Sequence, residues 1–264
     1  MGVSYRYAGG SRPSLLDLDL KLPDGQIVGL AGASESGKST LCLVLSGLAP
    51  RAIRGACTGT LLVDGEDGTA WPMHRMAEAV GTSFQDPLTQ LSGVTATVFE
   101  EVCFGPMNLG MPRDDVIGHT WAALETLGIE TLAPRDPSTL SGGQMQLVAI
   151  AGLLAMQPRH LVLDEPTAQL DPAGTALVGE ALARLAARGT SILIAEQKTD
   201  LLSRICGRVL VLDSGRVVLD GPAAEVLGDP RLDELGVPVP SAIRLRRAID
   251  AAGLMLDIPA DLVA

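Results

Sequence analysis

The sequence predicts an α/β fold built around a largely parallel sheet. A short β-rich run at 27–31 leads directly into a glycine-rich loop and then into a helical pattern at 38–48. Three later runs are continuously apolar and are separated by helical patterns, as expected for parallel strands that are buried on both faces: 160–163, 192–195 and 209–212. With 264 residues, of which 47% are hydrophobic, the chain can form one large domain, or one domain with an appendage.

Further strands and helices are predicted in the part of the chain before residue 160. Strands are expected at 3–7, at 60–63 before an Asp64-Gly65 turn, and at 79–84. From Leu91 to about Gln157 the sequence is rich in helical patterns that are interrupted by Gly-Pro and Pro-containing segments. We therefore expect a helical insertion between the first strands and the last three.

The C-terminal part is predicted to be a hairpin followed by helices. The last apolar strand turns at Asp213-Ser214-Gly215 into another β-rich run at 216–219. From Pro222 onward the pattern is helical with proline breaks, and it ends in a helix at 241–252 that has one apolar face.

Charge and composition exclude several classes of protein. The formal net charge of -11 and the pI of about 4.7 argue against nucleic acid or an anionic membrane as the main partner, because both require clustered basic residues. The longest nearly apolar run, 145–156, is too short to span a bilayer, and no secretory signal pattern is present, so we expect a cytosolic protein. The four cysteines form no Cys-x-x-Cys pair, which predicts neither a zinc site nor a disulfide framework.

A phosphate-binding loop is predicted at 32–40. This segment matches the pattern G-x-x-x-x-G-K-[ST] and lies between a predicted strand and a predicted helix. We expect backbone N–H groups to bind the phosphates, Lys38 to reach the β- and γ-phosphate oxygens, and Ser39 to ligate Mg²⁺. The expected nucleotide contacts are Gly32, Ala33, Ser34, Glu35, Ser36, Gly37, Lys38, Ser39 and Thr40. The predicted ligand is ATP with Mg²⁺.

Two carboxylates follow each other at the end of a predicted apolar strand. Asp164 closes the strand and Glu165 comes next. Such a pair can be an ordinary solvated strand end. Beside a phosphate loop, however, we expect Asp164 to hold Mg²⁺ and Glu165 to be the general base that polarises the attacking water.

A second phosphate-binding helix start is predicted at Leu140-Ser-Gly-Gly-Gln144. Ser141 is a favourable N-cap, and Gly142 and Gly143 allow backbone donors to approach an anion before a helix that we expect to begin at Gln144. One ATP cannot easily be bound by both loops of a single chain.

This loop and the Leu-Val-Leu-Asp-Glu-Pro-Thr stretch at 161–167 are identified as the pattern of ATP-binding-cassette (ABC) ATPases. The resemblance implies a RecA-like P-loop core with an antiparallel β subdomain and a helical subdomain, plus a short C-terminal helical extension. It places the ATPase domain at 1–225, the helical subdomain at about 91–158, and the extension, as a dimer contact, at 226–264. It also implies a head-to-tail dimer, in which residues 141–144 close over ATP held by the partner's phosphate loop.

Three more residues take their expected roles from this resemblance. Gln85 resembles the Q-loop glutamine that reaches the metal and the attacking water, although by itself it would be a turn residue before Asp-Pro. Tyr7 resembles the aromatic residue that stacks on adenine and is favoured over Tyr5; either could instead be a core aromatic. Asp171 resembles the D-loop residue that couples the two ATP sites, and it is also a typical helix start before proline.

Two positions depart from the ABC pattern. Gln197 follows Glu196 where ABC ATPases usually carry a switch histidine, and none of the three histidines of the chain can take that place. A glutamine amide can donate a hydrogen bond to the γ-phosphate but cannot relay a proton, so we expect slow hydrolysis at this chain's own site. Glu35 stands where transporter phosphate loops commonly have glycine, and we expect its side chain to turn harmlessly outward.

The segment at 84–110 is similar to the ATPases of energy-coupling factor (ECF) importers. It carries Gln-Asp-Pro at 85–87 and Glu-Glu-Val-Cys-Phe-Gly-Pro-Met-Asn-Leu-Gly at 100–110. The resemblance implies that 86–110 receives a coupling helix from a transmembrane T component. The apolar residues of this segment could instead be core of the helical subdomain.

A second similarity to ECF ATPases lies near the C-terminus, in Leu-Gly-Val-Pro-Val-Pro at 235–240 with Leu245 and Ile249 beyond it. In that family the extension helps to hold the two ATPases together. The implied function is an ATPase that powers uptake of a vitamin, a vitamin precursor or a metal ion. Its implied partners are a second ABC ATPase chain, the T component and a substrate-binding S component, and it would lie peripherally at the cytoplasmic face of the cell membrane.

Alternatives remain for both function and partner. The chain could be the ATPase of a conventional ABC transporter, or a soluble non-transport ABC ATPase, although no long coiled coil, basic face or second cassette is present. The partner ATPase could be identical or distinct. Gln197 favours a distinct chain, because an asymmetric pair can tolerate one weakened site.

Overall fold

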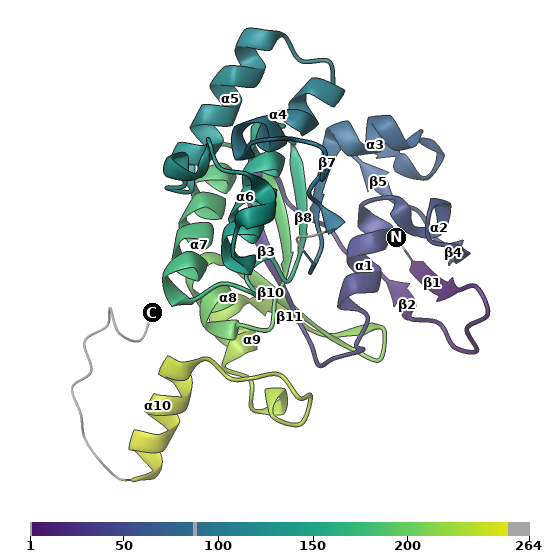
Figure 1. Cartoon of the computed structure of the whole chain (residues 1–264). Coiled ribbons are helices and arrows are strands. Elements are labelled where there is room, and N and C mark those ends of the chain that lie inside the picture. The colour runs from purple at the N-terminus through teal and green to yellow at the C-terminus, as the bar shows by residue number, and fades with distance from the viewer. Residues whose placement is uncertain (1, 87–88, 253–264) are drawn as a thin grey trace.

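The centre of the molecule is a six-stranded sheet (Figure 1). The structure is a computed structural model that describes residues 2–86 and 89–252. The strands of this sheet are β3 (Ile27–Ala31), β7 (Val80–Ser83), β8 (His160–Asp164), β9 (Ser191–Ala195), β10 (Arg208–Asp213) and β11 (Arg216–Pro222). Their order is β11-β10-β3-β9-β8-β7, with β11 antiparallel to β10 and all other neighbours parallel. The predicted α/β fold with a parallel sheet is confirmed.

Both faces of this sheet are covered by helices, which explains the continuous apolar strands. All five residues of β9 are buried. Leu193 packs into a core with Leu41 of α1 (Lys38–Leu45), whereas Ile192 and Ile194 pack into a second core with Leu182 of α7 (Pro172–Ala187). Alternate residues of one strand therefore bury apolar surface on opposite faces, which is the main source of stability for such a layer.

A smaller antiparallel sheet lies beside the first. Its strands are β1 (Val3–Tyr7), β2 (Leu15–Leu18) and β4 (Gly55–Thr58), in the order β2-β1-β4. A short hairpin, β5 (Leu62–Val63) with β6 (Glu66–Asp67), follows it. The prediction for β1 is confirmed, and the strand expected at 60–63 is shorter than predicted. β2 and β4 were not predicted, since one is four residues long with an acidic residue inside and the other consists of small residues.

The expected helix-rich segment is confirmed and contains α4 (Val98–Asn108), α5 (Arg113–Thr126) and α6 (Gly142–Ala155). α4 and α5 both pack on α6. α4 begins with a capping box, in which Thr97 Oγ1 accepts from the Glu100 N–H at 3.2 Å and Glu100 Oε2 accepts from the Thr97 N–H at 3.1 Å. Pro87 and Leu88, within the segment assigned to the coupling-helix groove, lie outside the described residues.

The remaining helices are short or lie at the end of the chain: α2 (Leu48–Arg51), α3 (Met73–Ala79), α8 (Thr199–Ile205), α9 (Ala223–Leu227) and α10 (Ser241–Ala251). The helix predicted at 38–48 ends three residues early, because Gly47 takes a positive φ of 71°. No residue of α10 is buried, and Leu245 is 56% exposed. Within the described part of the chain, no helix is long and apolar enough to cross a membrane.

Candidate functional site

Four loops meet at the carboxyl edge of the parallel sheet. β3, β9, β8 and β7 are consecutive neighbours in the sheet. The predicted phosphate loop follows β3, Gln197 lies two residues after β9, Asp164 ends β8, and Gln85 lies two residues after β7. Because parallel strands end at the same edge, these segments of distant sequence form one site, which is where ligands bind in open α/β sheets.

The phosphate loop passes from β3 into α1 with a backbone that requires glycine at one point. Gly37 has a φ of 111°, and a Cβ atom there would lie 2.7 Å from the carbonyl oxygen of Ser14. A side chain is therefore excluded by both conformation and space. Glu35 also has a positive φ, 64°, and it is exposed to solvent, as expected for a side chain turned away from the phosphates.

Lys38 is held inside this loop. Its side chain is buried, and Nζ donates hydrogen bonds to the carbonyl oxygens of Gly32 at 2.8 Å and Ala33 at 2.9 Å. Burial lowers the pKa of Lys38, and the nearby carboxylates of Glu165 and Asp164 oppose that shift. Lys38 Nζ is thus held at the centre of the loop by two backbone carbonyl groups.

Asp164 is a buried carboxylate, and its Oδ1 atom has no hydrogen-bond partner among the described residues. Burial raises the pKa of Asp164, while the neighbouring Ser39 hydroxyl opposes the shift. A carboxylate oxygen without a partner beside a hydroxyl is a suitable donor set for Mg²⁺, which commonly takes only one or two protein oxygens together with phosphates. Among the described residues, no group of three or more His, Cys, Asp or Glu side chains is placed to hold a metal ion.

The other two predicted catalytic residues, Gln85 and Gln197, both contact Glu165. Its Oε1 atom accepts a hydrogen bond from Gln197 Nε2 at 2.7 Å, and its Oε2 atom accepts one from Gln85 Nε2 at 3.1 Å. The backbone of Glu165 has a φ of 49°, and its N–H donates to the carbonyl oxygen of Ala195 at 2.8 Å. Strained backbone of this kind is concentrated at functional sites.

Glu196 is a buried carboxylate that the sequence interpretation had not singled out. Only 1% of its surface is exposed. It accepts hydrogen bonds from Thr167 Oγ1 at 2.6 Å and from the N–H groups of Gln197 at 2.8 Å and Lys198 at 3.2 Å. Glu196 therefore fixes the backbone that carries Gln197.

Lys198 connects the same segment to the chain before Asp171. Its Nζ donates to the carbonyl oxygens of Thr167 at 2.6 Å and Leu170 at 3.0 Å, and to Thr175 Oγ1 at 3.0 Å. Asp171 N-caps α7, accepting from the Gly174 N–H at 2.7 Å, so its interpretation as a helix start is confirmed and its coupling role stays a prediction. The only signal for Lys198 in the sequence was its position next to Gln197.

Tyr7 lies beside the phosphate-loop helix. Its hydroxyl is 3.0 Å from Thr40 Oγ1, and its ring makes an edge contact with Tyr5, with 5.0 Å between centroids. Tyr5 is buried and donates from its hydroxyl to the carbonyl oxygen of Ile53 at 2.9 Å. Tyr7 is partly exposed, so of the two tyrosines it is the one whose ring a ligand can reach.

The Leu140–Gln144 loop is the start of α6. Ser141 Oγ accepts from the Gln144 N–H at 3.3 Å, and Gln144 Oε1 accepts from the Ser141 N–H at 3.1 Å, so Ser141 is the N-cap, as predicted. The predicted helix start at Gln144 was wrong, because Gly142 and Gly143 form the first turn. Among the described residues, no hydrogen bond joins this loop to the phosphate loop, and the structure does not bring the two together.

Comparison with known proteins gives concordant matches. A family model described as ABC transporter matches residues 15–168. A putative ABC transporter ATP-binding protein from Methanosarcina acetivorans is 40% identical, with 98% of this chain aligned to only 42% of that protein's length. The energy-coupling factor transporter ATP-binding protein EcfA1 from Halalkalibacterium halodurans is 37% identical over 97% of this chain and 90% of its own. The structure of cbiO1 from Clostridium perfringens, part of the ABC transporter complex cbiONQ, has a TM-score of 0.76 and 31% identity over 93% of this chain and 96% of that one.

Proposed function

This chain belongs to the ABC transporter family, and from that premise we propose that it binds ATP with Mg²⁺ and hydrolyses ATP to power a membrane importer of the ECF type. One observation carries the proposal. Glu165 is held by the amides of Gln85 and Gln197 at the sheet edge where the phosphate loop also lies. A carboxylate held in this place can orient and deprotonate the water that attacks a terminal phosphate in line.

The phosphate loop supplies the binding step. Its backbone N–H groups and the start of α1 face the phosphates, with Lys38 as the fixed positive charge. Ser39 and Asp164 would hold Mg²⁺, which when bound neutralises charge on the β- and γ-phosphate oxygens. Tyr7 offers a partly exposed ring beside α1 on which adenine can stack.

Glu165 supplies the proton-transfer step. Its carboxylate accepts a proton from the attacking water, and the two amides orient its oxygens without competing for the proton. Gln197 takes the place that a switch histidine has in other family members, and its neutral amide offers a hydrogen bond but no charge. Slow hydrolysis at this chain's own site follows from that difference.

A second ATPase chain completes the proposed assembly. The Leu140–Gln144 loop is a capped helix start with backbone donors that serve an anion, yet no hydrogen bond joins it to the phosphate loop within the described chain. We therefore place it over ATP in a partner, with Asp171 at the contact between the two sites. A distinct partner is favoured, since its own site can offset the weakness caused by Gln197. We also propose that the ATPase domain spans 1–225 and that the C-terminal extension, which contacts the partner, spans 226–264.

The membrane-facing surface is proposed to lie on α4, α5 and the loop before them. Large apolar side chains are exposed there, and the most exposed are Val94 at 77% and Met107 at 64%. Phe104, Ile117 and Trp121 are exposed in the same segment. This supports docking of a coupling helix from a T component, with the transported vitamin, vitamin precursor or metal ion bound by a separate S component. The chain would then be peripheral at the cytoplasmic face of the membrane.

The test is purification of the complex from its own membrane through a tag on this chain, followed by native mass spectrometry and assay of phosphate release. We expect a second ATPase, a small apolar membrane protein and ATP hydrolysis. Recovery of a soluble complex without membrane proteins contradicts the proposal. A conventional pair of large permease subunits, without a separate substrate-binding membrane protein, supports instead the conventional-transporter alternative.

A further inference from the structure

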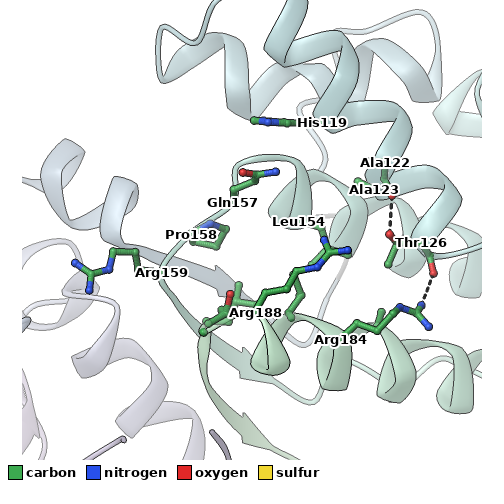
Figure 2. Close-up of a pocket in the computed structure, with 15 residues that line it drawn as sticks. His119, Ala122, Ala123, Thr126, Leu154, Gln157, Pro158, Arg159, Arg184 and Arg188 are labelled. Atoms are coloured by element: carbon green, nitrogen blue, oxygen red, sulfur yellow. Dashed lines mark hydrogen bonds between the residues drawn. The ribbon is translucent and has the colours of Figure 1, made fainter. Parts of the chain in front are cut away.

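A cavity of about 430 Å³ lies far from the nucleotide site, between α5, the end of α6 and α7 (Figure 2). Arg159, which directly precedes β8, and Thr190, which directly precedes β9, help to line it. The cavity is therefore at the amino edge of the parallel sheet. The phosphate loop, Glu165 and Gln197 are all at the opposite, carboxyl edge.

The charged side chains that line this cavity are all basic. They are Arg159, Arg184 and Arg188, and no carboxylate is among the lining residues. Arg159 points away from the other two (Figure 2). It pairs with Asp64, with Nη1 3.0 Å from Oδ2. Arg184 and Arg188 extend from the end of α7 toward α5 (Figure 2). These two guanidinium groups form the polar side of the cavity.

Among the described residues, Arg184 forms one long, exposed ion pair and Arg188 forms none. Arg184 Nη2 donates to the carbonyl oxygen of Thr126 at 2.9 Å, and its nearest acid, the exposed Glu180, is 3.9 Å from Nη1. Arg188 makes no ion pair or side-chain hydrogen bond with any described residue. The negative end of the α7 dipole favours cations here, but like charges four residues apart on a helix repel each other. A bound anion would relieve that local repulsion.

The other sides of the cavity carry polar side chains, those of His119, Thr126, Gln157 and Thr190, and an apolar floor. His119 Nδ1 is buried and has no hydrogen-bond partner among the described residues. The floor is formed by Leu154, Leu161, Ala181 and Leu185. A ligand that combines an anionic group with an apolar part would fit this lining.

We propose that this cavity binds a small organic phosphate. Two guanidinium groups match the oxygens of a phosphate in both geometry and charge, since a phosphate ester carries about -1.5 to -2 at neutral pH. The phosphate lies against Arg184 and Arg188, and the organic part lies on the floor near Leu154 and Leu185. The volume is in the range of small-molecule sites.

Isothermal titration with phenyl phosphate tests this proposal. The protein is first saturated with Mg²⁺ and a non-hydrolysable ATP analogue, so that the phosphate loop is filled. We expect one equivalent of phenyl phosphate to bind. Arg188→Gln weakens that binding about tenfold or more, because a charge-assisted hydrogen bond is lost. Ala122→Leu, at an exposed lining position of α5, blocks the cavity without removing charge.

Arg246→Gln is the matched control, because it removes the same charge from an exposed position on α10, outside the cavity. It is expected to leave binding unchanged, and thermal unfolding checks that each variant is folded. Absence of binding to the wild-type protein, or equal loss in the Arg246→Gln control, overturns the proposal. Sedimentation with phosphatidylcholine vesicles containing phosphatidylglycerol distinguishes a lipid headgroup. If the protein binds vesicles in an Arg188-dependent way but does not bind phenyl phosphate, the proposal of a small soluble ligand is also overturned.

Discussion

Gln197 donates a hydrogen bond from Nε2 to Oε1 of Glu165 over 2.7 Å. The residue proposed for the switch position thus contacts the proposed general base directly. Gln85 occupies the other carboxylate oxygen, so two neutral amides hold Glu165 between them. A neutral donor orients a carboxylate but adds no charge to the site, which is why the identity of residue 197 is expected to set the rate of hydrolysis at this site.

Replacing Glu165 is expected to separate ATP binding from hydrolysis. Glu165→Gln keeps the shape of the side chain but removes the proton acceptor, so phosphate release in a single turnover should fall by about 10²–10⁴ while ATP affinity is retained. Glu130→Gln, at an exposed position away from the site, is the matched control. Unchanged single-turnover release in Glu165→Gln would place the general base elsewhere.

Tyr7 is expected to contribute to ATP affinity through its ring and not through its hydroxyl. Tyr7→Ala should weaken ATP binding roughly tenfold, since stacking of a base on an aromatic ring is worth about 1–3 kcal/mol. Tyr7→Phe loses only the contact with Thr40 Oγ1 and should bind ATP nearly as well as the wild type. Equilibrium binding of a fluorescent ATP analogue measures both. Equal affinities in Tyr7→Ala and the wild type would rule out stacking at this position.

The buried charge of Asp164 is expected to cost stability in the protein without nucleotide. Burial raises the pKa of Asp164, so the folded state binds this proton more tightly than the unfolded state. The contribution of Asp164 to the free energy of unfolding is therefore greatest at low pH, and it is lost as pH rises through the folded-state pKa. At pH 7, Asp164→Asn should raise Tm by about 2–4 °C and abolish hydrolysis. A lower Tm, measured by calorimetry, would show that the ionised carboxylate is net stabilising.

Lys198 is expected to position the segment that carries Gln197. Lys198→Met keeps the aliphatic stem but removes three hydrogen bonds, to Thr167, Leu170 and Thr175. We expect kcat of the assembled complex to fall several-fold, with KM for ATP little changed, because no phosphate contact is lost. Lys198→Arg, which retains donors, should recover part of the rate. A rise in KM with unchanged kcat would argue for a role in ATP binding instead.

The sequence allowed the sheet and its main loops to be predicted because their residues leave local patterns. Ile192 to Ala195 are buried on both faces, and such strands must be continuously apolar. The glycine at 37 is required by its own φ of 111°. β4 could not be predicted in this way, because its small residues gain their strand conformation only by pairing with β1, about fifty residues earlier.

The side-chain contacts inside the site could not be predicted from the sequence, for a related reason. Glu165, Gln85 and Gln197 were each expected at the site, but their convergence on one carboxylate depends on side-chain conformations that only the assembled sheet defines. The same holds for Glu196, whose partners lie both next to it and 29 residues away. The helix start at Gly142 was missed because glycine disfavours helices by itself, while the Ser141 capping box stabilises this one.

The most direct test of this account is the turnover of the assembled complex when Gln197 is replaced by histidine. Gln197→His introduces a side chain that can carry charge and relay a proton beside Glu165, and we expect ATP turnover to rise, by up to about 10². Gln26→His, at the opposite edge of the sheet, should leave turnover unchanged. A complex that gains nothing from Gln197→His would contradict the claim that the amide at this position limits hydrolysis.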